Sequence, residues 1–237
     1  MNPNIWGKSF WVFLLYIVSN YGTIYGQNGY PLFDEVHRMH RFLNIIGYIL
    51  PCKKTCSINY YKNIQIYPIE NYIQTRNTLT KWLYEMNNLI RSENSQEPIT
   101  FDQFIEKYSV GQLETMNHIK KTLIYVAKEY PLKPCFDDIM QYKNFYSYLK
   151  SLNAIKNFDI YMDMYPIDNY LTNRKLLLDW ILMFYKQPCN KYLTITPYPQ
   201  TTELFSKVSQ SEYNILYVAL VASIGLGTFY LYKEYLK

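Results

Sequence analysis

The sequence predicts an all-α protein with two tandem four-helix-bundle units and a C-terminal transmembrane helix. Three observations predict this fold: apolar residues recur at helical spacing, one segment occurs twice, and the last apolar run has the length of a membrane span. No run of residues shows the alternation of a β-strand. The 237 residues, 49% hydrophobic and 18% charged, are enough to bury a core, and this composition excludes wholesale disorder.

The first unit is expected to begin with two helices. The apolar run Phe10–Val18 is interpreted as core rather than as a signal peptide, because one cation precedes it and no small-residue cleavage site follows. Helical spacing places Trp11, Leu14, Leu15 and Val18 on one side of the first helix, and Phe33, Val36, His40, Leu43, Ile46 and Leu50 on one side of the second.

Two further helices complete the unit. Pro51 interrupts the second helix, and a short third helix is expected from about Cys52 to Tyr61. A fourth follows Pro68 and ends near Arg91. Short connections favour antiparallel packing, so residues 1–108 are predicted to form a four-helix bundle. The inward side of the fourth helix carries Leu79, Trp82, Leu83 and Met86.

The fourth helix and its approach are repeated later in the chain. Residues Tyr67–Met86 align without gaps to Tyr165–Phe184, and a Tyr-Pro-Leu lies upstream of each copy, at Tyr30 and Tyr130. We interpret this as a tandem duplication, with a second, degenerate bundle at 109–195. The identical pairs include Tyr67/Tyr165, Pro68/Pro166, Asn71/Asn169, Tyr72/Tyr170, Arg76/Arg174, Leu79/Leu177 and Trp82/Trp180.

The C-terminal region is predicted to be a membrane anchor. Residues 215–232 carry no charge, and tyrosines lie near both ends of this run, where amphipathic rings prefer the interface. A buried C-terminal helix is the alternative interpretation. A linker at 196–212, rich in Pro, Ser, Thr and Gln, precedes the anchor at 213–232. The expected protein is tail-anchored, with its soluble part on the cytosolic side.

The charge and cysteine counts exclude two classes of protein. The net charge of +5 arises from 24 basic and 19 acidic residues without a basic block, so no nucleic-acid partner is expected. Four cysteines are too few for a disulfide framework.

The chemical signal is Leu50-Pro51-Cys52-Lys53-Lys54-Thr55-Cys56. Proline at a helix start places both thiols where free N–H groups and the helix dipole favour thiolate, and the two lysines add to this effect. Spacing of one helical turn also permits a disulfide. The alternatives are two buried structural cysteines or half a metal site. No metal is expected, because His37, His40 and His118 have no ligand-like spacing relative to the pair.

Three stretches of the first unit follow the order and spacing of a known family. The first unit resembles the Erv/ALR family of FAD-dependent sulfhydryl (thiol) oxidases, although it is divergent. The resemblance implies a bundle around the flavin, with the cysteine pair at the start of the third helix. The stretches are Trp6-Gly7-Lys8-Ser9-Phe10-Trp11 with Asn20-Tyr21; Phe42-Leu43 with Leu50-Pro51-Cys52 and Cys56; and Thr75-Arg76, Leu79, Trp82-Leu83 and Asn88 with Pro98 and Phe101.

The resemblance also implies FAD as the cofactor and a set of residues around it. The cysteine motif here has one residue more than the family's pair, and Leu15 and Asn87 replace two family histidines. Trp11, Trp82 and Tyr60 would supply aromatic walls, Asn87 and Asn88 would donate to the ring or ribose, and Lys8 or Arg91 would pair with the pyrophosphate.

The mechanism that the resemblance implies is the oxidation of protein dithiols to disulfides. A substrate thiol attacks the disulfide at Cys52, Cys56 passes electrons to the flavin, and dioxygen is reduced to hydrogen peroxide. The implied partners are protein dithiols, or a thioredoxin-like relay protein, and dioxygen. An excess of Tyr, Asn, Ile and Lys is typical of A+T-rich genomes and, with the resemblance, indicates a viral source. Host membranes or the virion envelope are then the expected locations.

The second unit cannot contain a copy of this site. Its corresponding stretch, Leu149–Ile155, has no cysteine, and Cys135 and Cys189 fall at opposite ends of the expected bundle as free thiols. Members of the family pair through their first two helices, so the second unit is predicted to replace a partner in an internal pseudo-dimer; a homodimer is the alternative. The alternative function is a catalytically inactive, membrane-anchored scaffold or virion structural protein.

Overall fold

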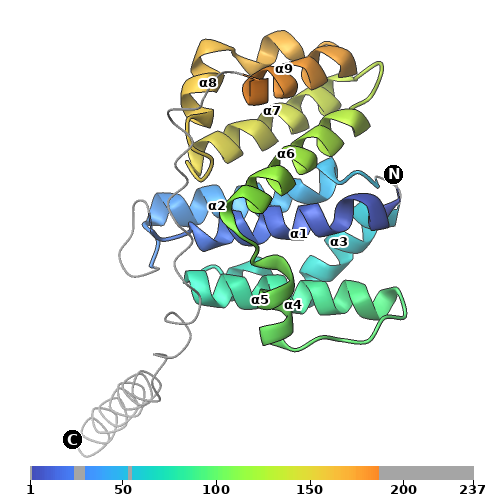
Figure 1. The fold of residues 1–237 in the computed structure, drawn as a ribbon, viewed down its shortest axis with the longest axis vertical. Coiled ribbons are helices and arrows are strands. Elements are labelled where there is room, and N and C mark those ends of the chain that lie inside the picture. The colour runs from blue at the N-terminus through green and yellow to red at the C-terminus, as the bar shows by residue number, and fades with distance from the viewer. Residues whose placement is uncertain (1, 24–29, 53–54, 187–237) are drawn as a thin grey trace, which may run out of the picture. The chain divides into compact units, whose positions relative to one another are not determined.

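The regular secondary structure is helical. The computed structural model describes residues 2–23, 30–52 and 55–186, and no strand occurs within these ranges, which confirms the all-α prediction (Figure 1). The first half comprises α1 (Pro3–Ser19), α2 (Phe33–Ile49), α3 (Thr55–Ile66), the 3₁₀ turn η1 (Ile69–Asn71), α4 (Arg76–Glu93) and α5 (Phe101–Tyr108). The second half comprises α6 (Gln112–Glu129), α7 (Phe136–Ser151), α8 (Phe158–Met164), η2 (Ile167–Tyr170) and α9 (Arg174–Lys186).

Side-chain caps account for where several helices begin. Asn2 accepts from the backbone N–H of Asn4 at 3.0 Å to start α1, and Thr75 accepts from the N–H of Thr78 at 3.1 Å to start α4. Thr100 starts α5 in a reciprocal cap with Gln103. The sequence did not predict α5, because eight residues are too few to show a helical period against the surrounding loop.

Helices α1 and α2 lie in the middle of the described structure. Helix α1 packs against α4, α5 and α6, and α2 packs against α3 and α7 (Figure 1). This explains why every residue of α1 from Val12 to Ser19 is buried, although the sequence predicted an apolar stripe on one side. A helix covered from several sides needs apolar residues around its whole circumference.

The prediction of which residues of α2 face the core is partly wrong. Leu43, Ile46 and Leu50 are buried as expected, but Phe33 is 85% exposed. The buried surface instead centres on Met39 and Phe42, because two neighbours contact this helix and widen its core face. The predictions for α4 are confirmed: its four inward residues, Leu79, Trp82, Leu83 and Met86, are at most 1% exposed.

Aligned residues make the same hydrogen bonds in both halves. The indole N–H of Trp82 donates to the carbonyl oxygen of Tyr67 at 2.8 Å, and that of Trp180 donates to Tyr165 at 2.9 Å. Each bond ties the helix that carries the tryptophan to the segment that precedes the 3₁₀ turn. The repeated Tyr-Pro and Trp positions therefore serve the same local packing.

The structure changes one correspondence between the halves. The sequence paired Tyr30 with Tyr130, but the counterpart of Tyr130 is Tyr21. The Tyr21 hydroxyl donates to the Ile73 carbonyl at 2.8 Å, and the Tyr130 hydroxyl donates to the Leu171 carbonyl at 2.6 Å. Ile73 and Leu171 are equivalent in the repeat, and both tyrosines follow the first helix of their half.

The two halves meet through equivalent helices. Helix α1 contacts α6, and α2 contacts α7. Phe42 and Phe145 lie ten positions into α2 and α7, respectively, and their rings stack at 5.9 Å with an interplanar angle of 22°. Equivalent residues that face one another are what an approximate two-fold relation between the halves produces.

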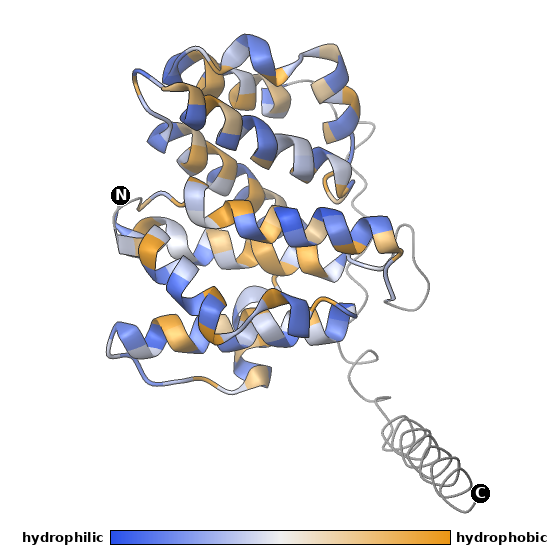
Figure 2. Cartoon of the chain, turned by 180° about the vertical axis from the view of Figure 1, so that it is seen from behind, coloured by the Kyte–Doolittle hydropathy of each residue, from blue (hydrophilic) through white to orange (hydrophobic). Residues whose placement is uncertain are grey.

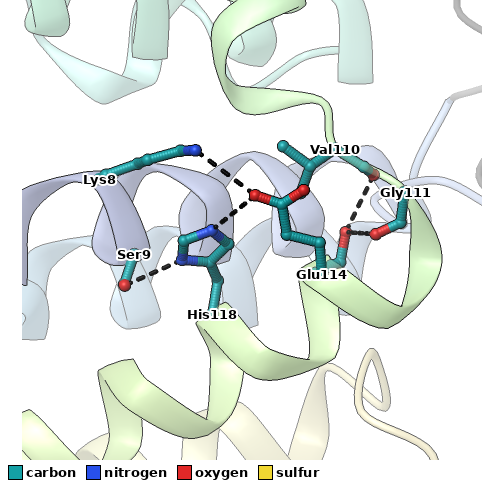
Figure 3. A network of polar contacts seen from close by, with 7 residues as sticks. Lys8, Ser9, Val110, Gly111, Glu114 and His118 are labelled. Carbon is teal, nitrogen blue, oxygen red and sulfur yellow. Dashed lines mark hydrogen bonds and ion pairs between the residues drawn. The ribbon is translucent and has the colours of Figure 1, made fainter.

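A polar network links α1 to α6 (Figure 3). Ser9 Oγ lies 2.9 Å from His118 Nδ1, and His118 Nε2 lies 3.3 Å from the Glu114 carboxylate, which also pairs with Lys8 at 3.4 Å. The hydrogen bond to His118 is the main cause that lowers the pKa of Glu114, and Lys8 adds to it. Ser9 and His118 are buried, whereas Lys8 and Glu114 are exposed, so this network runs from the surface into the contact between the halves.

The predicted linker at 196–212 and the predicted anchor at 213–232 lie outside the described residues. Figure 2 shows that the described helices mix hydrophilic and hydrophobic residues. None of these helices is long and apolar enough to cross a membrane.

Candidate active site

The two thiols lie at the beginning of the third helix. Cys56 is in the first turn of α3, and its backbone N–H donates to the carbonyl of Cys52 at 3.1 Å, which closes a turn of helical size between them. Both cysteines are free thiols and about half-buried against the core. The helix itself runs from Thr55 to Ile66, farther than the predicted end near Tyr61.

Their environments push the two pKa values apart. Burial acts to raise the pKa of Cys52, but hydrogen bonds from the Cys56 thiol and from the backbone N–H groups of Thr55 and Cys56 outweigh burial and lower it. Burial raises the pKa of Cys56 to about 12, with its hydrogen bond to Cys52 as the next cause. Cys52 is therefore the more acidic thiol of the pair, and Cys56 is the thiol that keeps its proton more strongly.

Both thiols line a cavity of about 350 Å³ at one end of the first half. The beginnings of α1 and α3 and the end of α4 surround it, together with Leu50, which follows α2. A cavity of this size falls in the usual range for small-molecule sites. The wall on α1 is aromatic and apolar: Trp6, Phe10, Trp11 and Leu14.

Neighbouring elements hold the cavity's aromatic walls in place. The Tyr60 hydroxyl donates to the Leu43 carbonyl at 2.6 Å, which fixes its ring on the α3 side. Trp11 is supported by α5, where the rings of Phe104 and Tyr108 lie 6.4 Å and 6.2 Å from it. Helix α5, which the sequence did not predict, thus supports one wall of the site.

Of the predicted flavin contacts, Trp11 and Tyr60 line this cavity with Cys52 and Cys56, and the other five residues do not. Lys8 pairs with Glu114 on α6 at 3.4 Å. Trp82 is buried and uses its N–H on Tyr67.

Three residues near the end of α4 have structural partners instead. Asn87 is buried, and its amide nitrogen lies 3.4 Å from the Tyr108 hydroxyl. Asn88 both donates to the Ile99 carbonyl at 2.8 Å and accepts from the Ile99 N–H at 2.9 Å. Arg91 donates to the Glu97 carbonyl at 2.8 Å. Asn88 and Arg91 therefore hold the loop that leads to α5.

The cavity also contains residues that the sequence analysis missed. Trp6 lies in its wall and is 7% exposed, and its indole N–H is buried without a hydrogen-bond partner. Asn59 and Glu93 form a polar part of the lining. Asn59 could have been found from its spacing of three residues from Cys56 on the same helix. No local signal connects Glu93 to the cysteines, because it belongs to another helix.

Cys135 is not part of this site. Cys135 precedes α7 and is exposed, and its thiol donates to the Asp138 carboxylate at 3.2 Å. Cys189 lies outside the described residues. In the described ranges, no group of three His, Cys, Asp or Glu side chains is placed to hold a metal ion.

Comparisons with known proteins identify no relative. No protein-family model, curated protein or solved structure matches this chain. The resemblance to the Erv/ALR family thus stays a prediction from the motifs.

Proposed function

We propose that this chain is an FAD-linked sulfhydryl oxidase that converts protein dithiols to disulfides and passes the electrons to dioxygen, giving hydrogen peroxide. The observation that carries the proposal is the shared cavity: two free thiols with opposed pKa shifts line it together with Trp11 and Tyr60. Perturbed thiols in an apolar pocket are what a redox site requires. The Erv/ALR-like motifs support the same reading.

The asymmetry of the thiols assigns their roles. A substrate thiolate attacks Cys52 of the disulfide, and the bond between Cys52 and Cys56 breaks. A second substrate thiol then attacks the mixed disulfide, forming the substrate disulfide and releasing Cys52 as thiolate. Its lowered pKa makes Cys52 the better leaving group in this step. Cys56, deeper and protonated, is the thiol from which electrons leave the protein.

The size and the aromatic lining of the cavity support a flavin ring as its ligand. Trp11 on α1 and Tyr60 on α3 would hold it, and FAD when bound would supply a two-electron acceptor that reacts with dioxygen. The unpaired, buried indole N–H of Trp6 in the same wall is a further polar group that a ligand can satisfy. The described lining contains no lysine or arginine, so it fits the ring rather than the pyrophosphate.

Purification tests this proposal directly. The full chain in detergent should be yellow, its flavin absorption should be lost from the protein on denaturation, and dithiothreitol should yield peroxide. Cys56→Ser should abolish peroxide production without unfolding the protein, whereas Cys135→Ser, at an exposed cysteine outside the cavity, should leave it unchanged. A colourless protein that forms no peroxide would defeat the proposal.

We further propose that protein dithiols or a thioredoxin-like relay protein are the substrates. Residues 213–232 would anchor the chain with its catalytic part on the cytosolic side.

We also propose that the second half replaces a partner subunit. The contacts of α1 with α6 and of α2 with α7 support this proposal. Mass measurement in detergent should give a monomer. A dimer joined through α1 and α2 would contradict it.

One observation favours a second candidate, a catalytically inactive membrane-anchored scaffold. Asn88 and Arg91, expected at the flavin, make their hydrogen bonds within the chain. The outcome of the flavin and peroxide measurements separates the two functions.

A further inference from the structure

The described lining of the cavity includes a carboxylate that has no role in the thiol oxidation proposed for this site. Glu93 is the last residue of α4 and lines the cavity with Cys52 and Cys56. Its Oε2 accepts from the Asn59 amide at 3.2 Å, and its Oε1 accepts from Asn63 at 3.1 Å once the Asn63 amide is turned to the orientation that satisfies both its oxygen and its nitrogen. Both oxygens are therefore held by α3, although the side chain itself is exposed.

Helix α3 holds the carboxylate on the face that carries the thiol. Cys56, Asn59 and Asn63 are spaced by three and four residues, which places them along one face of the helix. Asn63 is fully buried, and its amide nitrogen also donates to the Asn59 carbonyl at 3.2 Å. A buried residue held in this way anchors Glu93 on the face that carries Cys56.

Re-forming the disulfide requires a group that accepts a proton. Burial raises the pKa of Cys56 to about 12, so this thiol must lose its proton when its sulfur forms the bond. The titratable side chains in the described lining are Cys52, Cys56, Tyr60 and Glu93. Cys52 is the thiol that reacts with Cys56, and the Tyr60 hydroxyl donates a hydrogen bond to the Leu43 carbonyl. This leaves Glu93 as the proton acceptor in the described lining. Lys53 and Lys54 lie outside the described residues.

We propose that Glu93 is the proton acceptor for the Cys56 thiol, through water in the cavity. In the step, the Cys52 thiolate and the Cys56 thiol form one S–S bond, and one proton passes to Glu93 and then to solvent; FAD, when bound, would accept the two electrons. This inference rests on the proposed function for the identity of the electron acceptor. The proton transfer from Cys56 to Glu93 does not depend on which molecule accepts the electrons.

A reaction in which oxidised glutathione, rather than flavin, accepts the electrons tests it, and this reaction is run without dioxygen. The full chain, with Cys135→Ser and Cys189→Ser, is reduced and mixed with oxidised glutathione. The Cys52 thiolate displaces one glutathione and forms a mixed disulfide. Cys56 then attacks the Cys52 sulfur, the second glutathione leaves as thiolate, and the proton of Cys56 goes to Glu93. Acid quenching and mass spectrometry follow the mixed disulfide.

Glu93→Gln should slow the resolution of the mixed disulfide by Cys56 about 100-fold at pH 7. This is the lower end of what a positioned base contributes to a rate. The difference should shrink at high pH, where hydroxide removes the proton, and Glu93→Asp should keep most of the rate. Glu97→Gln, at an exposed carboxylate outside the cavity, should behave as the parent.

Two results would overturn the inference: resolution by Glu93→Gln as fast as by the parent, or a slowing that is equal at pH 7 and pH 10, which would indicate a structural effect. Melting followed by circular dichroism shows that the variants are folded. Because glutathione rather than flavin accepts the electrons, a failed peroxide assay would defeat the proposed function without affecting this measurement.

Discussion

The two halves share their helix packing but fill equivalent places with different chemistry. Asn63 of the first half aligns with Tyr161 of the second, and Met86 aligns with Phe184. In the first half, Asn63 holds Glu93 beside the thiol-lined cavity. In the second, the Tyr161 ring lies 5.1 Å from Trp180 and 5.0 Å from Phe184. One half keeps polar groups near reactive thiols, and the other is filled by aromatic rings.

This difference indicates how the two halves can divide their tasks. A buried polar group contributes little net stability, and an unsatisfied one is costly, so a site weakens the half that contains it. The aromatic half contributes packing to the shared structure through α6 and α7, which contact α1 and α2. We therefore expect substitutions in the second half to affect mainly stability, and substitutions at the thiol-lined cavity to affect mainly chemistry.

The largest effect is expected from the aligned tryptophans. Trp82 and Trp180 are both at most 1% exposed and make the same hydrogen bond, but Trp180 also has rings of Tyr146, Phe158 and Tyr161 within 6 Å. Trp180→Ala should lower the free energy of unfolding by about 5 kcal/mol and Trp82→Ala by about 3 kcal/mol, the range for buried large-to-small changes. Urea denaturation measures both. An equal loss of unfolding free energy in the two variants would contradict the prediction that the aromatic second half contributes more to stability.

Gly47 should be the next most sensitive position. A Cβ added there would lie 2.7 Å from atoms of the Tyr60 and Tyr61 rings, so α2 and α3 could not keep their approach. Gly47→Ala should lower the free energy of unfolding by about 1–3 kcal/mol, as overpacking does. The equivalent position in α7 is Lys150, where Lys150→Ala removes only a pair with Asp163 and should cost less than about 1 kcal/mol. Thermal melting of the two variants gives the comparison.

The thiol pair should show its asymmetry in alkylation. In the reduced protein at pH 7, iodoacetamide should modify Cys52 before Cys56, because the pKa of Cys52 is lowered and that of Cys56 is raised to about 12. Cys56→Ala removes a hydrogen bond to the Cys52 sulfur and should slow Cys52 alkylation several-fold at pH 7. Peptide mapping measures the rates, with exposed Cys135 as the reference in the same chain. Faster modification of Cys56 would contradict the assignment.

The smallest effects are expected from the aligned ion pairs His40–Glu70 and Lys143–Asp168, each 2.7 Å long. The pKa of Glu70 is lowered, first by its own backbone N–H and then by His40, so its contribution is present above the carboxyl's usual range and is lost as pH falls below it. Both pairs are exposed, so each should contribute less than about 1 kcal/mol.

Glu70→Gln should therefore lower the free energy of unfolding at pH 7 and have a smaller effect at pH 3, where the Glu70 carboxyl is protonated. Asp168→Asn should cost less than about 1 kcal/mol at pH 7. Urea denaturation at the two pH values measures this. An effect of Glu70→Gln that is as large at pH 3 as at pH 7 would show that the carboxylate charge contributes nothing to stability.

The sequence by itself determined the helical class, the repeat and the position of the cysteine pair. Helical spacing identified the inward residues of α4, because this helix buries one face. The Tyr67/Tyr165 alignment located equivalent hydrogen bonds, because each tyrosine precedes a 3₁₀ turn and lies only 15 positions before its tryptophan in the chain. Periodicity reports on such local geometry directly.

Only the tertiary structure decided which faces are covered and which residues meet. It covered α1 from several sides, left Phe33 exposed, and placed Glu93 in the cavity of Cys56, 37 positions away in the chain. The physical reason is that spacing shows which side of a helix is apolar but not what packs against it. Contacts between distant helices depend on how all the apolar surfaces are buried together.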